Sequence, residues 1–556
     1  MASPAQLRQV LRVGPPGDGW HRPALSAVLT LGTLNLALFA LGRLDLALYT
    51  SVGGLGALYG HGLPYRARAR TLAGVLLGAV LSAGAALTAA ALTRDAAVLV
   101  AVAAVLAALH KLLCDAARVG PPGALIITFT TAGCAFVPQR LADLAPHLAL
   151  AAVGAALAWL VCMAPALWHP YGPERTATAR ALEVAARLLR TDPGAPDAAA
   201  RTALVGAVDA ARRSLALSSP ARQRALGEEP ERLLVHAEAA LASPVDPAAA
   251  ERYAAWARDL RRGRRPVPSP ELTEAEAADL RALPPVRRLP LRAVLRPGSA
   301  LLPIALRVAV GCAAAGWLSL ALGVGRPYWA VVTAASVFQA NSTLSWQRAV
   351  QRVLGNLLGL ALFTAAVPVA RCGPVALIAL GLLCQFGAEA MIARSYWLAT
   401  VFVTPMALLM TEFAGPQPAR MLVADRWLDT CVGALTGLVA CLLVTNRRTA
   451  ARLSRAVADT ETATRAARAA LAVLAADRTG STAADRAAPA ADRTGSTAAR
   501  AVLAAALLEL REAADTATGE WRRPTLPHQH AADTERHAHH LLTALLEHRG
   551  GGARAV

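Results

Sequence analysis

The sequence predicts an all-α polytopic membrane protein built from two parallel blocks of six transmembrane helices. Three observations predict this fold. First, 55% of the residues are hydrophobic although 17% are charged, and the two classes occupy separate stretches of the chain. Second, two long apolar stretches, 24–168 and 298–446, each divide into six segments near the roughly 20 residues that cross a bilayer. Third, the stretches between and after these blocks have the apolar spacing of soluble helices.

Six spans are expected in each block. The first block is expected to cross the membrane at 24–42, 44–60, 72–92, 96–113, 122–137 and 147–167. The second is expected to cross it at 300–321, 327–340, 353–370, 373–391, 396–411 and 427–445. Ranges 122–137 and 327–340 are short for a bilayer. They are tilted spans, re-entrant segments or spans with misplaced boundaries.

Three polar regions lie outside the blocks: 1–23, 169–297 and 447–556. In the central region, Ser219-Pro220 and Asp246-Pro247 place a capping residue before a proline, which is typical of helix starts. The tail is rich in alanine and also reads as helical. Both regions lie on the same face of the membrane if each block has six spans. We therefore expect them to pack together as one helical cytoplasmic domain.

Arginines beside the blocks predict the orientation. They precede the first span, precede the seventh span or follow the twelfth, at Arg8, Arg12, Arg22, Arg292, Arg296, Arg447, Arg448, Arg452 and Arg455. Six spans per block place all of them on one side, and positive residues favour the cytoplasmic side. We expect a multi-pass protein of the cell (inner or plasma) membrane with both termini in the cytoplasm.

The two blocks share an order of features: a span of small residues, a polar loop with basic groups, and a helix with a small-xxx-small pair. An even number of spans per block makes the repeats parallel, with an axis along the membrane normal. Such glycine pairs allow helices to approach closely, and a role in a moving helix is the alternative. The pairs are Gly74 and Gly78, Gly355 and Gly359, and Gly433 and Gly437.

Several classes of function are excluded by composition. The net charge of +19 is almost wholly arginine, and aromatic residues make up only 4% of the chain, so basic clusters interleaved with aromatics are missing. Walker A, GxSxG and HExxH motifs are absent, and the eight cysteines include no CxxC spacing. We expect no enzymatic activity, cofactor, metal site or nucleic-acid partner. The tail histidines, among them His537, His539 and His540, are expected on a solvated helix face.

Two stretches resemble the fusaric acid resistance family. They are GRPYWAVVTAASVFQ, from Gly325 to Gln339, and QRVLGNLLG, from Gln351 to Gly359. The Tyr-Trp-Ala and Arg-Val-Leu-Gly runs match the family pattern, whereas Asn356 replaces the usual threonine. The layout of six spans, a soluble region and six spans also matches. The resemblance implies an inner-membrane protein of a family that includes aromatic acid exporters. A more distant similarity links the fold to aluminium-activated malate transporters, which are anion channels.

Charged residues in spans are candidates for a solute pathway because burying a charge in a bilayer is costly. Glu389 is a candidate proton carrier, and a structural pair with Arg394 or Arg307 is the alternative. Arg307 is a candidate anion ligand because guanidinium binds carboxylate through two parallel hydrogen bonds. Its alternative is to reach the headgroups.

Further candidates lie at span ends. His110 and Lys111 would form a gate with Glu389, or simply end the fourth span. A ring of arginines at the cytoplasmic mouth would raise the local anion concentration, unless these residues only mark topology: Arg66, Arg68, Arg70, Arg348 and Arg352. Tyr328 and Trp329 belong to an aromatic belt or stack on an aromatic substrate.

These candidates predict a secondary transporter that exports small organic acids, with aromatic carboxylic acids as the class suggested by the resemblance. Two alternatives remain open: an anion channel on the same scaffold, and a non-transport scaffold that presents its helical domain to partners. The expected partners are the lipid bilayer and a small organic anion. A homo-oligomer and an accessory membrane-fusion protein are left open.

Overall fold

The computed structural model describes residues 10–15, 19–190, 198–227, 229–243, 245–266, 299, 301–339, 341–415, 417–443, 448–480, 489–519 and 528–550. Within these ranges the regular structure is helical throughout and includes no strand. Four of the arginines used to predict the orientation lie outside them: Arg8, Arg292, Arg296 and Arg447.

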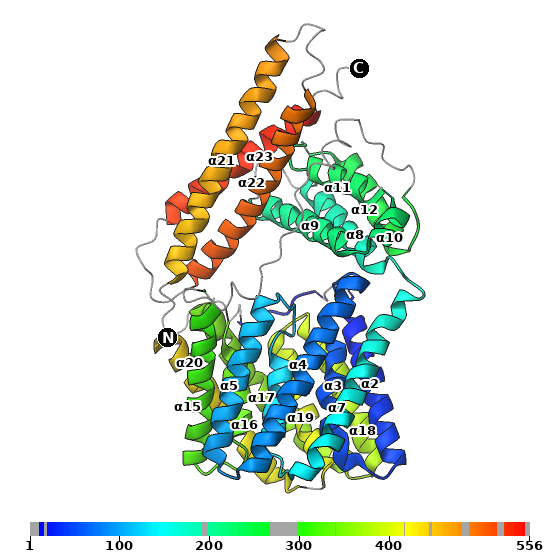
Figure 1. The fold of residues 1–556 in the computed structure, drawn as a ribbon, viewed down its shortest axis with the longest axis vertical. Coiled ribbons are helices and arrows are strands. Elements are labelled where there is room, and N and C mark those ends of the chain that lie inside the picture. The colour runs from blue at the N-terminus through cyan, green and yellow to red at the C-terminus, as the bar shows by residue number, and fades with distance from the viewer. Residues whose placement is uncertain are drawn as a thin grey trace.

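A bundle of apolar helices forms one end of the molecule (Figure 1). The first block contains α2 (His21–Ala40), α3 (Ala47–Gly54) with η2 (Leu55–Leu58), α4 (Tyr65–Leu92), α5 (Ala96–Ala116), α6 (Leu125–Ala135) and α7 (Leu144–Met163). The second contains α15 (Leu301–Ala321), α16 (Tyr328–Val337), α17 (Ser342–Ala370), α18 (Pro374–Ile392), α19 (Tyr396–Glu412) and α20 (Ala419–Leu443). The protein is thus a polytopic all-α membrane protein, as the sequence predicts.

Helix lengths repeat between the blocks. In the part of the chain that the structure describes, eight helices are long and apolar enough to cross a membrane, and four apolar helices are shorter. The short ones are the second and fifth helices of each block: α3, α6, α16 and α19. Three helices begin well before the predicted spans, namely α4, α17 and α20. Arginine is a good helix former, so the basic residues preceding those spans continue the helix rather than ending it.

The two blocks pack against each other reciprocally. α5 lies against α15, and α2 lies against α18, so the first helix of each block meets the fourth helix of the other. At the first contact, Trp317 Nε1 donates to the carbonyl of Ala97 at 3.0 Å. A Cβ added to Gly316 would lie 2.5 Å from the Val100 side chain. Two parallel repeats related by an approximate twofold axis produce this pairing, and no lipid-filled gap separates the bundles at these contacts.

The glycine pairs of the second block lie where helices approach closely. A Cβ added to Gly355 on α17 would lie 2.4 Å from the Trp397 carbonyl of α19. A Cβ added to Gly433 on α20 would lie 2.5 Å from the Ala330 carbonyl of α16. Gly359 and Gly437 continue the same two contacts. Since backbone atoms occupy these positions, a larger residue would push the helices apart.

The prediction is wrong for the pair in the first block, because a Cβ at Gly74 or Gly78 would have no neighbour within 4 Å. Here the close approach joins α3 and α7 instead. A Cβ on Gly154 would lie 2.1 Å from the Thr50 carbonyl, and one on Gly53 would lie 2.2 Å from the Ala151 carbonyl. A small-residue pair marks a narrow helix face, but only the neighbouring helices decide which face is packed.

The remaining helices form a domain on one side of the bundle (Figure 1). They are α8 (Gly172–Leu188), α9 (Ala198–Leu217), α10 (Pro220–Leu226), α11 (Glu229–Ala239) and α12 (Pro247–Arg261), then α21 (Arg448–Gly480), α22 (Pro489–Thr518) and α23 (His528–Gly550). One apolar core contains Leu182 and Leu233 from the central region and Leu503 and Leu542 from the tail. The two regions therefore pack as a single domain. We call the bundle face that meets this domain the domain side, and the opposite face the far side.

One tail histidine departs from the expected solvated position. His539 on α23 is only 9% exposed. Its Nε2 lies 3.2 Å from the Thr202 hydroxyl of α9. The imidazole is buried because the tail packs against the central region, which the spacing of the histidines alone does not reveal.

Candidate functional site

A cavity of about 200 Å³ lies between the two blocks. The first block contributes mainly apolar wall residues from η2 and α6, including Leu55 and Phe129. The second block contributes walls from α16 to α20 and all of the polar groups, which are Arg352, Gln385, Glu389, Tyr396, Thr400 and Arg426. An apolar chamber with a few convergent polar groups is the usual form of a small-molecule site.

Arg426 is the most deeply buried of the charged groups in the cavity, at 1% exposed. It lies on α20, and its guanidinium carbon is 4.9 Å from the centre of the Trp329 ring. Among the residues that the structure describes, neither its Nε nor its Nη1 has a hydrogen-bond partner. A buried cation with unused donors is costly to the protein. An anion in the cavity would satisfy those donors.

Arg352 on α17 is the second buried cation, at 3% exposed. Its Nη1 donates to the Tyr396 hydroxyl at 3.3 Å. Its Nε has no partner within the described part of the chain. One turn earlier, the Arg348 guanidinium lies 3.8 Å from the centre of the Tyr396 ring. The two arginines therefore hold Tyr396 at the cavity wall, and Arg352 keeps one donor free.

Glu389 supplies the carboxylate of the cavity. It lies on α18, one turn after Gln385, whose Nε2 donates to the Glu389 carboxylate at 3.4 Å. No arginine or lysine of the described ranges lies within ion-pair distance of Glu389, so the alternative pair with Arg394 or Arg307 is not formed. The cavity thus combines two guanidinium groups with one carboxylate that can exchange a proton.

The cavity lining runs inward from the domain side as far as Arg426, and Trp329 lies beyond Arg426 toward the far side. Pro23, at the start of α2, and Ile392, at the end of α18, line it near the domain side. At the other end Trp329, 1% exposed, lies between Arg426 and Arg326, whose guanidinium carbon is 5.5 Å from the ring centre. Arg326 in turn pairs with Asp425 at 3.2 Å. A solute would have to displace this stack to leave by the far side.

One comparison with known proteins covers most of the second block. Residues 313–440 match the family model described as fusaric acid resistance protein-like. The chain contains a fusaric acid resistance-like domain. All six polar groups of the cavity lie within the matched residues.

One curated relative is similar over a limited stretch. It is the "Uncharacterized membrane protein YvaC" of Bacillus subtilis (strain 168), 32% identical over 155 residues. The match covers 28% of this chain and 24% of that protein, so it spans about a quarter of the relative's length. No solved structure matches the chain.

The predicted gate residues His110 and Lys111 lie on α5 of the first block, outside the fusaric acid resistance-like domain. His110 is buried in the first block, with its ring nitrogens 3.1 Å from the Thr128 hydroxyl and 2.8 Å from the Ser82 hydroxyl. Lys111 pairs with Asp115 at 2.8 Å. Neither His110 nor Lys111 lines the cavity. The predicted gate with Glu389 is therefore wrong, because both side chains are engaged within their own block.

The predicted ring of arginines also breaks up. Arg66 and Arg70 are exposed on α4 and do not line the cavity. Arg68 points inward and donates to the carbonyls of Gly60 and His61, so it holds the connection between η2 and α4. Arg307 is buried on α15, outside the cavity wall. Of the predicted ring, Arg352 alone lines the cavity, and Arg348 packs behind it on Tyr396.

The other aromatic expectation is also corrected. Trp329 is not in a boundary belt, since it is enclosed in the bundle. Tyr328 packs beside it and meets Phe136 of the first block, with 5.8 Å between ring centres. Both residues thus pack inside the bundle near the far side, where the two blocks meet.

Sequence reasoning missed Arg426. The last span was predicted to begin at 427, which placed this residue outside it. Because α20 already begins at Ala419, Arg426 lies two turns inside the helix. The signal that could have found Arg426 is the apolar run Met421-Leu422-Val423, which continues the helix ahead of it.

The first block carries a weaker version of the Arg426 arrangement. His147 on α7 stacks on Tyr49 of α3, with ring centres 3.7 Å apart and planes 9° apart. These are the sixth and second helices of their block, as α20 and α16 are of theirs. The repeat therefore keeps an aromatic ring beside a basic group on its second and sixth helices. At these positions the first block has a histidine, whereas the fusaric acid resistance-like domain has the permanently charged Arg426.

Proposed function

We propose that the protein is a secondary transporter that exports small organic anions, aromatic carboxylates above all, through the cavity between its two blocks. A multi-pass membrane protein with a fusaric acid resistance-like domain supports a transporter in general terms. The single observation that supports an anionic substrate is the pair of buried arginines, Arg352 and Arg426, whose unpartnered donors lie at the wall of a mainly apolar chamber. Guanidinium groups bind carboxylates through parallel charge-assisted hydrogen bonds.

The size and lining of the cavity favour an aromatic acid. An apolar cavity of about 150 Å³ accommodates a benzene ring. A chamber of about 200 Å³ has room for a ring with a carboxylate attached. The ring would lie against the side chains of Phe129, Val403 and Met406, and the carboxylate would face the arginines.

The position of Trp329 between the cavity and the far side supports export as the direction of transport. The solute enters from the domain side, which the flanking arginines favour as the cytoplasm. It leaves by displacement of Trp329 as the two blocks move about their common axis. Glu389, the carboxylate in the same chamber, is the candidate carrier of a coupled proton. The anion's own gradient is the alternative driving force.

Flux into liposomes that contain the purified protein tests this proposal. We expect saturable uptake of radiolabelled benzoate and of at least some members of a panel of aromatic carboxylates. Arg352→Gln and Arg426→Gln should each lower it at least tenfold, whereas Arg70→Gln, at an exposed site on α4, should leave it unchanged. Absence of saturable flux with every acid, or flux that survives both cavity substitutions, would reject the proposal.

The same preparation separates the two alternatives. Single-channel currents that ignore a pH gradient would favour an anion channel on this scaffold. A non-transport scaffold would be expected to fill its bundle with large side chains. The chamber with unsatisfied arginine donors argues against that alternative.

A further inference from the structure

The extramembrane domain meets the bundle at an end-to-end junction of two helices. The carbonyl oxygen of Gly519, just after α22, accepts hydrogen bonds from Thr343 N at 2.9 Å and from Thr343 Oγ1 at 2.7 Å. The Asn341 side-chain amide donates to the Asp515 carbonyl at 3.2 Å. The last carbonyls of one helix thus satisfy the first donors of another, and the two helix dipoles run head to tail.

Asn341 has two roles at this junction. Its Oδ1 accepts from Leu344 N at 2.8 Å and caps α17, while its Nδ2 holds α22. The fit is tight, because a Cβ on Gly519 would lie 2.1 Å from Asn341 Nδ2 and 2.3 Å from its Cγ. The amide cannot swing aside without giving up the cap. The junction therefore holds the start of α17 in one position.

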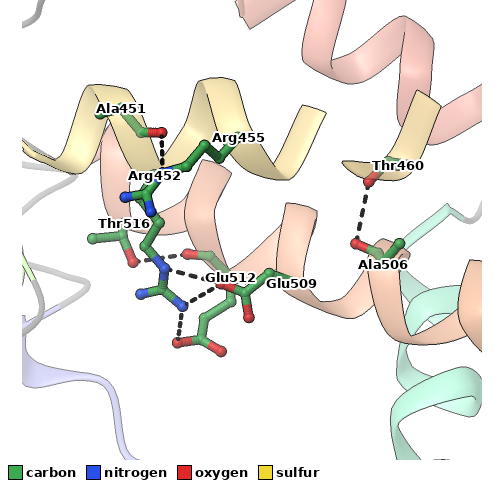
Figure 2. Close-up of polar contacts among 8 residues, drawn as sticks. All are labelled: Ala451, Arg452, Arg455, Thr460, Ala506, Glu509, Glu512 and Thr516. Carbon is green, nitrogen blue, oxygen red and sulfur yellow. Dashed lines mark hydrogen bonds and ion pairs between the residues drawn. The ribbon is translucent and has the colours of Figure 1, made fainter. Parts of the chain in front are cut away.

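The hairpin formed by α21 and α22 is itself braced (Figure 2). Arg452 Nη2 lies 2.8 Å from the Glu509 carboxylate and 2.9 Å from that of Glu512. Thr460 Oγ1 donates to the Ala506 carbonyl at 3.3 Å further along the hairpin. Buried side chains from both helices pack between them. Because α21 and α22 are held together at several points, a displacement of one helix moves the other with it.

This hairpin connects the two helices that carry the cavity arginines. Its first helix, α21, follows α20 after residues 444–447, which lie outside the described residues, and α20 carries Arg426. Its second helix, α22, ends on α17, which carries Arg352 about three turns beyond Asn341. Between them, Arg348 packs on Tyr396, the residue that Arg352 also contacts. A shift at Asn341 would therefore reach the cavity wall.

We propose that Asn341 and Thr343 are positioning residues of the anion site. Through them the end of α22 sets the start of α17, and hence the position of Arg352 relative to Arg426 on α20, the helix that packs against α17. This role rests on the proposed anion transport. A carboxylate that must contact two guanidinium groups is sensitive to small changes in their spacing. Loosening the junction should weaken the binding of the anion before it slows translocation.

Asn341→Asp is the sharpest variant, because it separates the two roles of this residue. Aspartate caps a helix as well as asparagine does. It cannot donate to the Asp515 carbonyl, and its charge repels the carbonyl end of α22. We expect KM for benzoate to rise about fivefold with the maximal rate nearly unchanged, since one or two hydrogen bonds are lost at the junction. Amide hydrogen exchange over 342–352 should become faster.

Matched variants control for a general loss of structure. Gly519→Ala should reproduce the rise in KM, whereas Gly381→Ala on α18, where a Cβ has no neighbour within 4 Å, should not. Thr343→Val should raise KM, and Thr343→Ser, which keeps the hydroxyl, should restore it. All variants are compared as full-length, monodisperse protein in liposomes.

Each outcome decides one of the two claims. A wild-type protein without flux of benzoate rejects the anion transport and the positioning role with it. Wild-type flux with an unchanged KM in Asn341→Asp and Gly519→Ala rejects the positioning role alone. Unchanged exchange over 342–352 in both variants also rejects it, because the junction would then not hold α17.

Discussion

Replacing Arg426 with methionine separates the cost of burying its charge from the benefit of binding an anion. The guanidinium is 1% exposed and two of its nitrogens have no partner among the described residues. Methionine has a similar length and no charge to desolvate. The variant should therefore be more stable than the wild type when no anion is bound, by about 1–4 kcal/mol, the range found when buried ion pairs are replaced by apolar residues of similar volume.

The same substitution should abolish stabilisation by the ligand. Each hydrogen bond from a charged donor contributes about 1.5–3 kcal/mol. Losing the two unpartnered donors of Arg426 would therefore weaken the binding of a carboxylate by about 3–6 kcal/mol, which is at least a hundredfold in affinity. In the wild type, benzoate at about a hundred times its Kd should add about 2.7 kcal/mol of stability. The variant should gain almost none at that concentration.

Thermal unfolding in nanodiscs, with and without benzoate, measures both effects as apparent Tm values. We expect Arg426→Met to have the higher Tm without benzoate and the wild type to show the larger rise with it. Arg70→Met, at an exposed site on α4, should behave as the wild type. A lower Tm of Arg426→Met without benzoate, or a benzoate-induced rise equal to that of the wild type, would refute the reasoning.

Three further predictions address the proton, the extramembrane domain and the helix contacts. Glu389→Gln should make benzoate flux insensitive to a pH gradient; flux that still follows the gradient would exclude Glu389 as the proton carrier. Burial lowers the pKa of His539 to about 4, with help from nearby cations, so the folded domain holds it neutral. The contribution of neutral His539 to the free energy of unfolding is fully present above the unfolded pKa of about 6.5. It falls as the pH drops toward 4, by up to about 3 kcal/mol. His539→Gln should reduce this acid sensitivity in denaturant titrations, and exposed His537→Gln should not. Gly154→Ala should destabilise the bundle by several kcal/mol because its Cβ meets backbone, whereas Gly74→Ala should be neutral or stabilising by up to about 1 kcal/mol; equal effects in unfolding assays would contradict the packing of α3 on α7.

The apolar pattern was sufficient to predict the bundle. Hydropathy is a local property, since each segment must satisfy its own backbone and match a bilayer wherever it lies. The same reasoning selected Glu389, because a charge inside a span needs a function or a partner. Arg352 was selected differently, as part of a mouth ring of arginines, and it proved to line the cavity. Helix starts were predicted less well. The basic residues before the predicted spans of α17 and α20 belong to these helices instead of ending them, and Arg426 was missed for that reason.

Which charged groups share one chamber was decided only by the tertiary structure. Lys111 and Arg70 carry the same positive charge as the cavity cations, yet Lys111 pairs with Asp115 and Arg70 is exposed. The surroundings of a side chain depend on how its helix is rotated and on which neighbouring helix covers that face. Neither is determined by the residues of the helix itself. The sequence by itself therefore determined two parallel six-helix blocks with charges in costly places. Packing determined that Arg352, Glu389 and Arg426 line one cavity between them.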